Sequence, residues 1–422
     1  MVGPMRRTSL LLLPALSLTL VACGTPPAGQ SAGQPAGTAP APGGAPGTGS
    51  GTAATPTAAP SPTASPTPAV PTCTDVAAKL TQPEQVGQLF MVGKGATSPV
   101  DESFRSVLRE TNAGSVLLLE NTTAGRTGVK RLTDQVRDAA VKPQGVGPLL
   151  AADQEGGLVQ RLKGEGFETI PAATEQAKLG DEELQQRVKT WGEELRQAGI
   201  DYDLAPVADT VPTSVGRANE PVGALRRGYG ADPNQVAPKA SAFVKGMAEA
   251  EVATSVKHFP NLGRVRGNTD LQSGVTDDQT TRTDPALKPF RDAVAAGADS
   301  VMVSTAIYSK IDPGKQATFS RVIVTDMIRD DLGFDGVVIS DDMGAAKQVA
   351  AVSPGDRALR FLEAGGDLVI NGDPSIQREM YAAVRDKAAS DPAFAQQVTE
   401  SAARVLALKA QQGAASCAAP AD

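Results

Sequence analysis

The 422-residue sequence contains a single histidine, His258, and only three cysteines. A zinc site built from several histidines is therefore impossible, and a Ser-His-Asp triad would have to use His258. Aromatic residues make up 4% of the chain, which argues against a stacking platform for an extended polymer. The net charge of −7 argues against a nucleic-acid partner. The chain holds 47 Asp and Glu residues, so carboxylates are the first candidates for proton chemistry, beside lysine, tyrosine and this one imidazole.

The N-terminal part of the chain has the pattern of a targeting segment followed by a tether. Arg6 and Arg7 precede an apolar run at 9–20 that is too short to span a bilayer. The run ends in Leu-Val-Ala before Cys23, which resembles a bacterial lipobox, with cleavage before Cys23 and lipid attached to it. The alternative is an ordinary signal peptide with an incidental cysteine. Residues 24–72 contain no charged and no aromatic residue, a composition typical of disorder.

Three segments follow from this pattern: a signal peptide at 1–22, a lipidated cysteine with its tether at 23–72, and a folded domain at 73–422. Cys73 and Cys417 lie at the two ends of the folded domain. Outside the cytoplasm we expect them to form a disulfide, and the alternative is two free thiols. The expected protein is a monomer outside the cytoplasm, anchored to the cell membrane by lipid and tethered into the cell wall.

Short apolar runs alternate with longer helical stretches along the folded domain. This alternation favours a parallel sheet covered on both faces by helices. Eight such units predict a closed (β/α)8 barrel of the TIM type, with a doubly wound open sheet as the alternative. No glycine-rich nucleotide-binding motif follows any predicted strand, which weakens that alternative. The predicted strands are 86–92, 115–120, 148–152, 203–207, 253–258, 300–304, 336–340 and 367–370, and the predicted helices include 182–198, 233–250, 285–296, 321–331 and 376–387.

Charged residues gather where predicted strands end. Asp153 follows the third strand, Asp209 lies just beyond the fourth, Lys257 and His258 end the fifth, and Asp341 follows the seventh. Barrel enzymes carry their chemistry at the C-terminal ends of the strands. A single residue of this kind is commonly a solvated cap, whereas four such strand ends indicate a shared polar pocket.

Several motifs then resemble one family. They are residues 80–90 (LTQPEQVGQLF), 153–157 (DQEGG), 257–260 (KHFP) and 332–343 (LGFDGVVISDDM). Together they resemble glycoside hydrolase family 3 β-N-acetylhexosaminidases of the single-domain barrel kind, and the lipoprotein arrangement resembles that of actinobacterial members. The resemblance implies no cofactor and no metal ion.

The resemblance also implies a retaining mechanism in which a carboxylate forms a covalent glycosyl-enzyme. Asp341 matches the family nucleophile; the other interpretation of this residue is a helix N-cap. The residues that match the sugar-binding positions are Asp153, Arg161, Arg227, Lys257 and His258, with Arg226 as the alternative to Arg227. Leu158 stands where relatives commonly have an arginine.

The chain departs from the family at the acid/base. Relatives carry an Asp-His pair after the KHFP motif, whereas here Asn268 and Asp270 occupy those two positions. We expect Asp270 to be the general acid/base, because a carboxyl group that faces Asp341 would have a raised pKa and start protonated. The alternative is a loop residue in a turn made with Gly267 and Asn268. Other candidates for the role are Asp277, Asp278, Glu155 and Glu220.

The expected function is an exo-acting β-N-acetylglucosaminidase that releases terminal N-acetylglucosamine from muropeptides or oligosaccharides. Arg264 and Arg266, in a glycine-bounded loop, are interpreted as solvated surface residues. Their alternative interpretation as an anion site would suit a phosphorylase or a carboxylated muramyl leaving group. An inactive glycan-binding lipoprotein and a β-glucosidase remain further alternatives. Trp191 is expected to pack within a helix.

Overall fold

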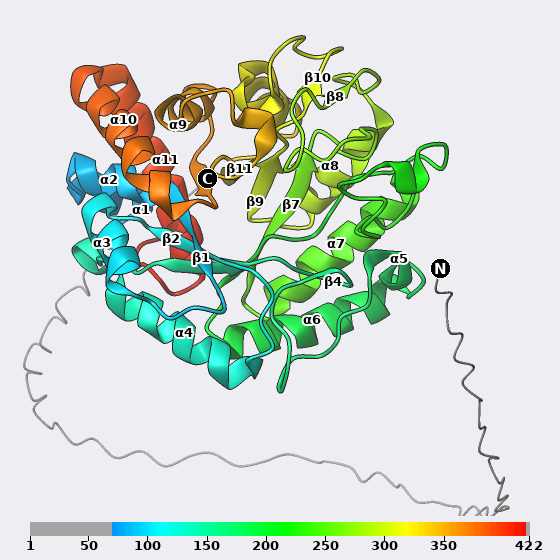
Figure 1. The fold of residues 1–422 in the computed structure, drawn as a ribbon, viewed down its shortest axis with the longest axis horizontal. Coiled ribbons are helices and arrows are strands. Elements are labelled where there is room, and N and C mark those ends of the chain that lie inside the picture. Colours follow the sequence, from blue (N-terminus) through cyan, green and yellow to red (C-terminus); the bar gives the residue numbers. More distant parts are fainter. Residues whose placement is uncertain (1–69, 419–422) are drawn as a thin grey trace, which may run out of the picture. The chain divides into compact units, whose positions relative to one another are not determined.

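The computed structural model describes residues 70–418, which form a closed barrel of eight parallel strands in the order β1-β12-β11-β9-β7-β6-β3-β2 (Figure 1). The predicted (β/α)8 barrel is therefore confirmed, and the open sheet is excluded. The predicted signal peptide, the lipidation site Cys23 and the tether up to residue 69 lie outside the described residues. The barrel strands are β1 (Phe90–Gly95), β2 (Ser115–Leu119), β3 (Leu149–Ala152), β6 (Tyr202–Asp203), β7 (Ala253–Phe259), β9 (Ser300–Val303), β11 (Val337–Asp342) and β12 (Leu368–Asn371).

The first and fourth predicted strands differ from the structure. Residues 86–88 belong to a helix, α2 (Gln82–Gln88), which begins with a capping box between Thr81 and Glu84. The apolar run at 86–92 thus spans the end of a helix and the start of β1. The capping-box pattern at Thr81 indicates the helix correctly, whereas the apolar run alone does not. The fourth strand is only two residues long, although the predicted run continues beside β7, where Val207 forms an isolated parallel bridge with Lys257.

Helices cover the outer face of the barrel (Figure 1). The segment predicted as one helix at 285–296 is a short 3-10 turn, η3 (Pro285–Leu287), followed by the helix α8 (Lys288–Ala295). The segment at 321–331 is a π-helix, η5 (Val322–Asp331).

Trp191 is buried in the helix α6 (Asp181–Gln197), where its Nε1 donates to Glu168 at 2.5 Å, so it packs as predicted. No helix of the described chain is long and apolar enough to cross a membrane. The remaining helices are α1 (Cys73–Lys79), α3 (Glu102–Thr111), α4 (Gly125–Ala139), α5 (Ala173–Gln176), α6 (Asp181–Gln197), α7 (Pro233–Glu249), α8 (Lys288–Ala295), α9 (Pro354–Glu363), α10 (Gln377–Ser390) and α11 (Pro392–Gln411).

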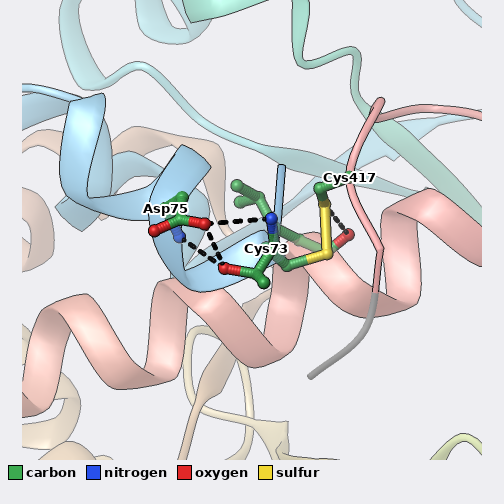
Figure 2. The surroundings of a disulfide bond; sticks show 5 residues. Cys73, Asp75 and Cys417 are labelled. Atoms are coloured by element: carbon green, nitrogen blue, oxygen red, sulfur yellow. Dashed lines mark hydrogen bonds between the residues drawn. A yellow bond between two sulfur atoms is a disulfide. The ribbon is translucent and has the colours of Figure 1, made fainter. Parts of the chain in front are cut away.

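The two ends of the folded domain meet beside each other. Helices α1 and α2 pack against α11 (Figure 1). Cys73 and Cys417 form a disulfide across this junction with their Cα atoms 4.9 Å apart, and the predicted pairing is confirmed (Figure 2). The backbone N–H of Cys73 also donates to the carbonyl of Ala418 at 2.8 Å. The chain therefore closes the barrel covalently as well as by strand pairing.

Side chains fill the part of the barrel interior that lies away from the C-terminal ends of the strands. Met91, Leu149, Tyr202 and Ile339 are buried in one apolar cluster inside the ring of strands. Because the interior is packed there, an open cavity can form only toward the C-terminal ends of the strands. Two small two-stranded sheets lie in the loops after the barrel strands. The antiparallel pair β4 (Gln154–Gly156) and β5 (Val159–Gln160) follows β3, and the parallel pair β8 (Thr276–Asp277) and β10 (Ile307–Tyr308) comes from the segments after β7 and β9.

Candidate active site

A cavity of about 200 Å³ lies at the C-terminal ends of the strands. The structure brings the two predicted catalytic aspartates and the five predicted sugar-binding residues to it, from the β3, β6, β7 and β11 ends and the loops that follow them. The predicted residues that line the cavity are Asp153, Arg161, Arg227, Lys257, His258, Asp270 and Asp341. Residues that sequence reasoning did not single out, among them Leu119, Leu204 and Met302, line the same cavity.

A buried network of ion pairs forms one wall of the cavity. Lys257 Nζ lies 2.7 Å from Asp153 Oδ1 and 2.7 Å from Glu155 Oε1. Arg227 donates to both oxygens of Glu155, at 2.7 and 2.8 Å. Burial would raise the pKa of Glu155, but Arg227 and Lys257 outweigh it and hold that pKa well below its usual range. Glu155 is thus a permanently ionised partner of two cations, and its prediction as an acid/base candidate is wrong.

Beneath this wall lies a second buried carboxyl group, that of Asp203. Its Oδ1 accepts the backbone N–H of Gln154 at 2.9 Å. Burial raises its pKa to about 8, while the Gln154 bond and Lys257 oppose the rise and Asp153 and Glu155 add to it. Asp203 is therefore mostly protonated at neutral pH, so it adds little negative charge under the cavity. No local pattern in the sequence marks this role, because it depends on residues from other strands.

Both ring nitrogens of the sole histidine have partners. His258 Nδ1 lies 2.6 Å from Asp209 Oδ2, and His258 Nε2 faces Arg227 Nη2 at 3.3 Å. These two contacts hold the imidazole between a carboxylate and a guanidinium. His258 is thereby fixed on the cavity wall with both of its ring nitrogens engaged.

The two aspartates that end β11 point in different directions. Asp342 Oδ1 accepts the backbone N–H groups of Gly344 at 2.7 Å, Gly372 at 2.9 Å and Ala345 at 3.2 Å. Asp341 Oδ1 accepts the N–H of Asp342 at 2.8 Å, and its Oδ2 has no hydrogen bond within residues 70–418. Asp342 therefore shapes the backbone, whereas Asp341 keeps an oxygen available to the cavity. A turn rather than a helix follows β11, so the N-cap interpretation of Asp341 is wrong.

Asp270 comes to the same cavity from the loop after β7. Its backbone N–H donates to Asn268 Oδ1 at 2.9 Å, so the predicted turn exists, yet the residue also lines the cavity. The loss of water around its carboxyl group raises the pKa of Asp270; Arg227 opposes this, and Asp342 adds to it. Burial also raises the pKa of Asp341, and the charge of Asp270 raises it further against the opposing effect of His258. The charge of Asp270 thus raises the pKa of Asp341, whereas the carboxylate that raises the pKa of Asp270 most is that of Asp342.

The other acid/base candidates do not line the cavity. Asp277 is buried and accepts the N–H groups of Gln279 at 2.7 Å and Thr280 at 2.8 Å. Glu220 accepts the N–H of Asn268 at 3.2 Å and so holds the Asp270 loop from outside. Asp278 is exposed away from the cavity lining. Of the carboxylates proposed from sequence for this role, Asp270 alone lines the cavity.

The arginines named from sequence divide into two groups. Arg227 lines the cavity, whereas Arg226 pairs with Glu175 outside it, so Arg227 is the cavity residue. Arg161 also lines the cavity, and its buried Nε has no protein partner within residues 70–418, which leaves a donor for a ligand. For Arg264, both interpretations from the sequence, a solvated surface residue and part of an anion site, are wrong.

The Arg264 guanidinium instead forms two bonds to Asp284, at 2.6 and 2.8 Å, and donates to Thr280 at 2.9 Å. A cation already paired in this way has no free face for an anion. Arg266 is exposed and does not line the cavity. Within residues 70–418, no group of three or more His, Cys, Asp or Glu side chains is placed to hold a metal ion.

Comparison with known proteins gives a consistent result. The family description "Glycosyl hydrolase family 3 N terminal domain" matches residues 81–408. A beta-hexosaminidase of Stenotrophomonas maltophilia is 33% identical over 316 residues, which cover 72% of this chain and 90% of that protein. A solved beta-N-acetylhexosaminidase from Beutenbergia cavernae is 46% identical with a TM-score of 0.77, over 79% of this chain and 99% of that one. A solved family 3 beta-N-acetylglucosaminidase from Paenibacillus is 28% identical with a TM-score of 0.71, over 81% of this chain and 65% of that one.

Proposed function

The chain belongs to glycosyl hydrolase family 3 and is a glycoside hydrolase of the hexosaminidase kind, and on this basis we propose that it is a retaining, exo-acting β-N-acetylglucosaminidase. In this proposal Asp341 attacks the anomeric carbon and forms a glycosyl-enzyme, and water then releases the sugar. The observation that carries the proposal is the cavity itself, in which the free oxygen of Asp341 and the carboxyl group of Asp270 face one enclosed space.

The size of the cavity supports exo action. Its volume of about 200 Å³ lies below the range of roughly 300–1,000 Å³ that is usual for sites of drug-sized ligands. A single sugar unit suits such a space, whereas an internal stretch of a polysaccharide does not. The remaining polar groups, Asp153, Arg161, Lys257 and His258, supply acceptors and donors for hydroxyl and acetamido groups.

In the first step the Asp341 carboxylate bonds to the anomeric carbon, the bond between that carbon and the glycosidic oxygen breaks, and Asp270 gives its proton to that oxygen, so that the aglycone leaves as an alcohol. In the second step Asp270 takes a proton from water, the water oxygen bonds to the same carbon, and Asp341 leaves as a carboxylate. The raised pKa of Asp270 supports the first step, because the group must hold its proton until the leaving group needs it.

Variants of the two aspartates test this proposal. Asp341→Ala is expected to abolish turnover of a 4-nitrophenyl N-acetyl-β-glucosaminide. Asp270→Ala is expected to lose about 10²–10⁴-fold of activity on N-acetylglucosamine disaccharides, whose leaving group needs a proton, and far less on aryl glycosides that leave as anions. Added azide is expected to restore the rate of the Asp270 variant on aryl glycosides and to give a β-glycosyl azide.

Asp278→Ala is the matched control, since it removes an exposed aspartate that does not line the cavity. An equal loss on every substrate by the Asp270 variant, with no rescue by azide, would remove Asp270 from the acid/base role. If the parent protein itself shows no turnover of any of these substrates, the result would instead favour an inactive glycan-binding protein.

The natural substrate in this proposal is a peptidoglycan fragment with terminal N-acetylglucosamine, and the protein works outside the cytoplasm on a lipid anchor at Cys23. The supporting observation is the sequence Leu-Val-Ala-Cys at 20–23 after a short apolar run. Replacing Cys23 by serine should move the protein from the membrane fraction to the medium. Retention of that variant on membranes would contradict lipid anchoring.

A further inference from the structure

Two large apolar side chains are exposed directly beside cavity-lining residues in the chain. Within residues 70–418, the large apolar side chains that face solvent are Val70, Leu158 and Leu271, at 64%, 63% and 72% exposure. Leu158 is the sequence neighbour of Val159, and Leu271 is the sequence neighbour of Asp270, and both of these neighbours line the cavity. Isolated exposed leucines need no explanation, but here two of the three exposed side chains adjoin the residues of one cavity.

The backbone holds both leucines in place. Leu158 lies at the tip of the β4–β5 hairpin, where Gly156 pairs with Val159 and the N–H of Gly157 donates to Ile170 at 2.9 Å. The N–H of Leu271 donates to Asn268 at 3.0 Å. An apolar surface that is fixed before binding loses little conformational entropy when a ligand covers it.

The proposed role of Asp270 indicates which part of the substrate contacts these side chains. If Asp270 protonates the glycosidic oxygen, the first atoms of the leaving group lie next to Asp270 and therefore next to Leu271. The sugar being cleaved fills the enclosed cavity, so the leaving group emerges at the mouth, between the loops that carry the two leucines.

From this geometry we infer that Leu158 and Leu271 form a leaving-group subsite that selects aglycones with an apolar surface. The inference rests on the proposed function, because it takes the position of the leaving group from the role of Asp270. The subsite recognises alkyl surface rather than hydroxyl groups, since the two leucine side chains offer neither donor nor acceptor. Binding there removes apolar area of both partners from water.

A series of alkyl N-acetyl-β-glucosaminides from methyl to hexyl tests the inference, because the leaving alcohols are chemically alike and differ in apolar area. For the parent protein, kcat/KM should rise with chain length. Full burial of one CH2 group contributes about 0.8 kcal/mol, which corresponds to a rise of up to about fourfold for each such group. In the double variant Leu158→Ser, Leu271→Ser the rise per CH2 should disappear. The corresponding alkyl thioglycosides, used as competitive inhibitors, should show the same trend in Ki without any chemical step.

Val70→Ser is the matched control, because Val70 is equally exposed but lies ahead of α1, away from the cavity lining. Its alkyl series should keep the slope of the parent. A flat series in the parent, or an unchanged slope in the double variant, overturns the subsite while leaving aryl glycoside hydrolysis, and so the proposed function, intact. Failure of the parent to hydrolyse aryl glycosides refutes the proposed function instead, and a flat Ki series then removes the subsite as well.

Discussion

A carboxyl group that donates a proton beside a second carboxylate must hold that proton at the working pH. In the proposed mechanism Asp270 meets this requirement, because partial burial and the neighbouring Asp342 raise its pKa, and the charge of Asp270 in turn adds to the rise that burial causes in the pKa of Asp341. The same coupling has a cost, because Asp341 can attack only when it is ionised. His258 and Lys257 reduce that cost, since their positions oppose the rise in the pKa of Asp341.

The pH dependence of kcat/KM follows from this pair. Asp341 must lose its proton to react, and its pKa is raised, so activity should fall on acidification at a pH above about 3.9, the ordinary value for aspartate. In the proposed mechanism Asp270 is still protonated when Asp341 loses its proton, so the neutral variant Asp270→Asn should leave the acid limb in place. The measurement uses a dinitrophenyl glycoside, which leaves without a proton. An acid limb that moves to lower pH in the variant would show that Asp270 is ionised when Asp341 titrates, which contradicts its role as the proton donor.

At the scale of elements, the Asp270 loop is fastened to the loop after β11, which carries Asp341. Gln348 is 2% exposed; its Oε1 accepts the N–H of Val275 at 2.9 Å, and its Nε2 donates to the carbonyl of Val275 at 3.1 Å. The backbone N–H of Gln348 also donates to Thr269 at 3.0 Å. One buried glutamine thus ties the loop of Asp270, the proposed acid/base, to the loop that follows Asp341, the proposed nucleophile.

Gln348→Met should therefore act as a change in positioning. It keeps the volume but leaves the buried N–H of Val275 unpaired, at a cost of about 1–3 kcal/mol, while the carbonyl of Val275 keeps its bond from the N–H of Ile307 at 3.0 Å. We expect roughly a tenfold loss of kcat on disaccharides and a much smaller loss on dinitrophenyl glycosides, which do not need Asp270. Parallel kinetics on the two substrates provide the measurement.

Gln85→Met is the matched control for that variant. Gln85 is also buried, and its Nε2 donates to Ala77 at 2.9 Å and to Leu80 at 3.3 Å, far from the cavity lining. This control should lose stability without changing the ratio of the two activities. An equal loss on both substrates by Gln348→Met would mean that the residue stabilises the fold without positioning Asp270.

The strands predicted from the sequence explain why some of the site residues could be predicted. Apolar runs such as 115–119 are buried on both faces, so their pattern marks the strand, and the residue after each strand must then reach the mouth. This reasoning found Asp153, Lys257 and Asp341. It could not find Gln348 or Asp203, because their roles arise from contacts made across 73 and 49 residues of chain and leave no local pattern.

At the scale of the whole molecule, the disulfide joins residues that are 344 positions apart and so closes nearly the entire folded domain. Such a crosslink stabilises mainly by restricting the unfolded chain, typically by 2–4 kcal/mol, and a chain-entropy estimate for so long a loop is about 6 kcal/mol. Cys73 is fully buried, and the junction lies near Gly147, ahead of β3 and opposite the cavity.

The paired variant Cys73→Ser, Cys417→Ser should consequently lose stability without losing catalysis. In guanidinium unfolding its free energy of unfolding should fall by about 2–4 kcal/mol, while kcat and KM on an aryl glycoside stay at parent values wherever the variant is folded. Reductant should lower the midpoint of the parent toward that of the variant and leave the variant unchanged. An unfolding midpoint equal to that of the oxidised parent would mean that packing of α1 and α2 against α11 already holds the ends together. A fall in kcat of the folded variant would mean that the closure of the barrel at its base reaches the catalytic end.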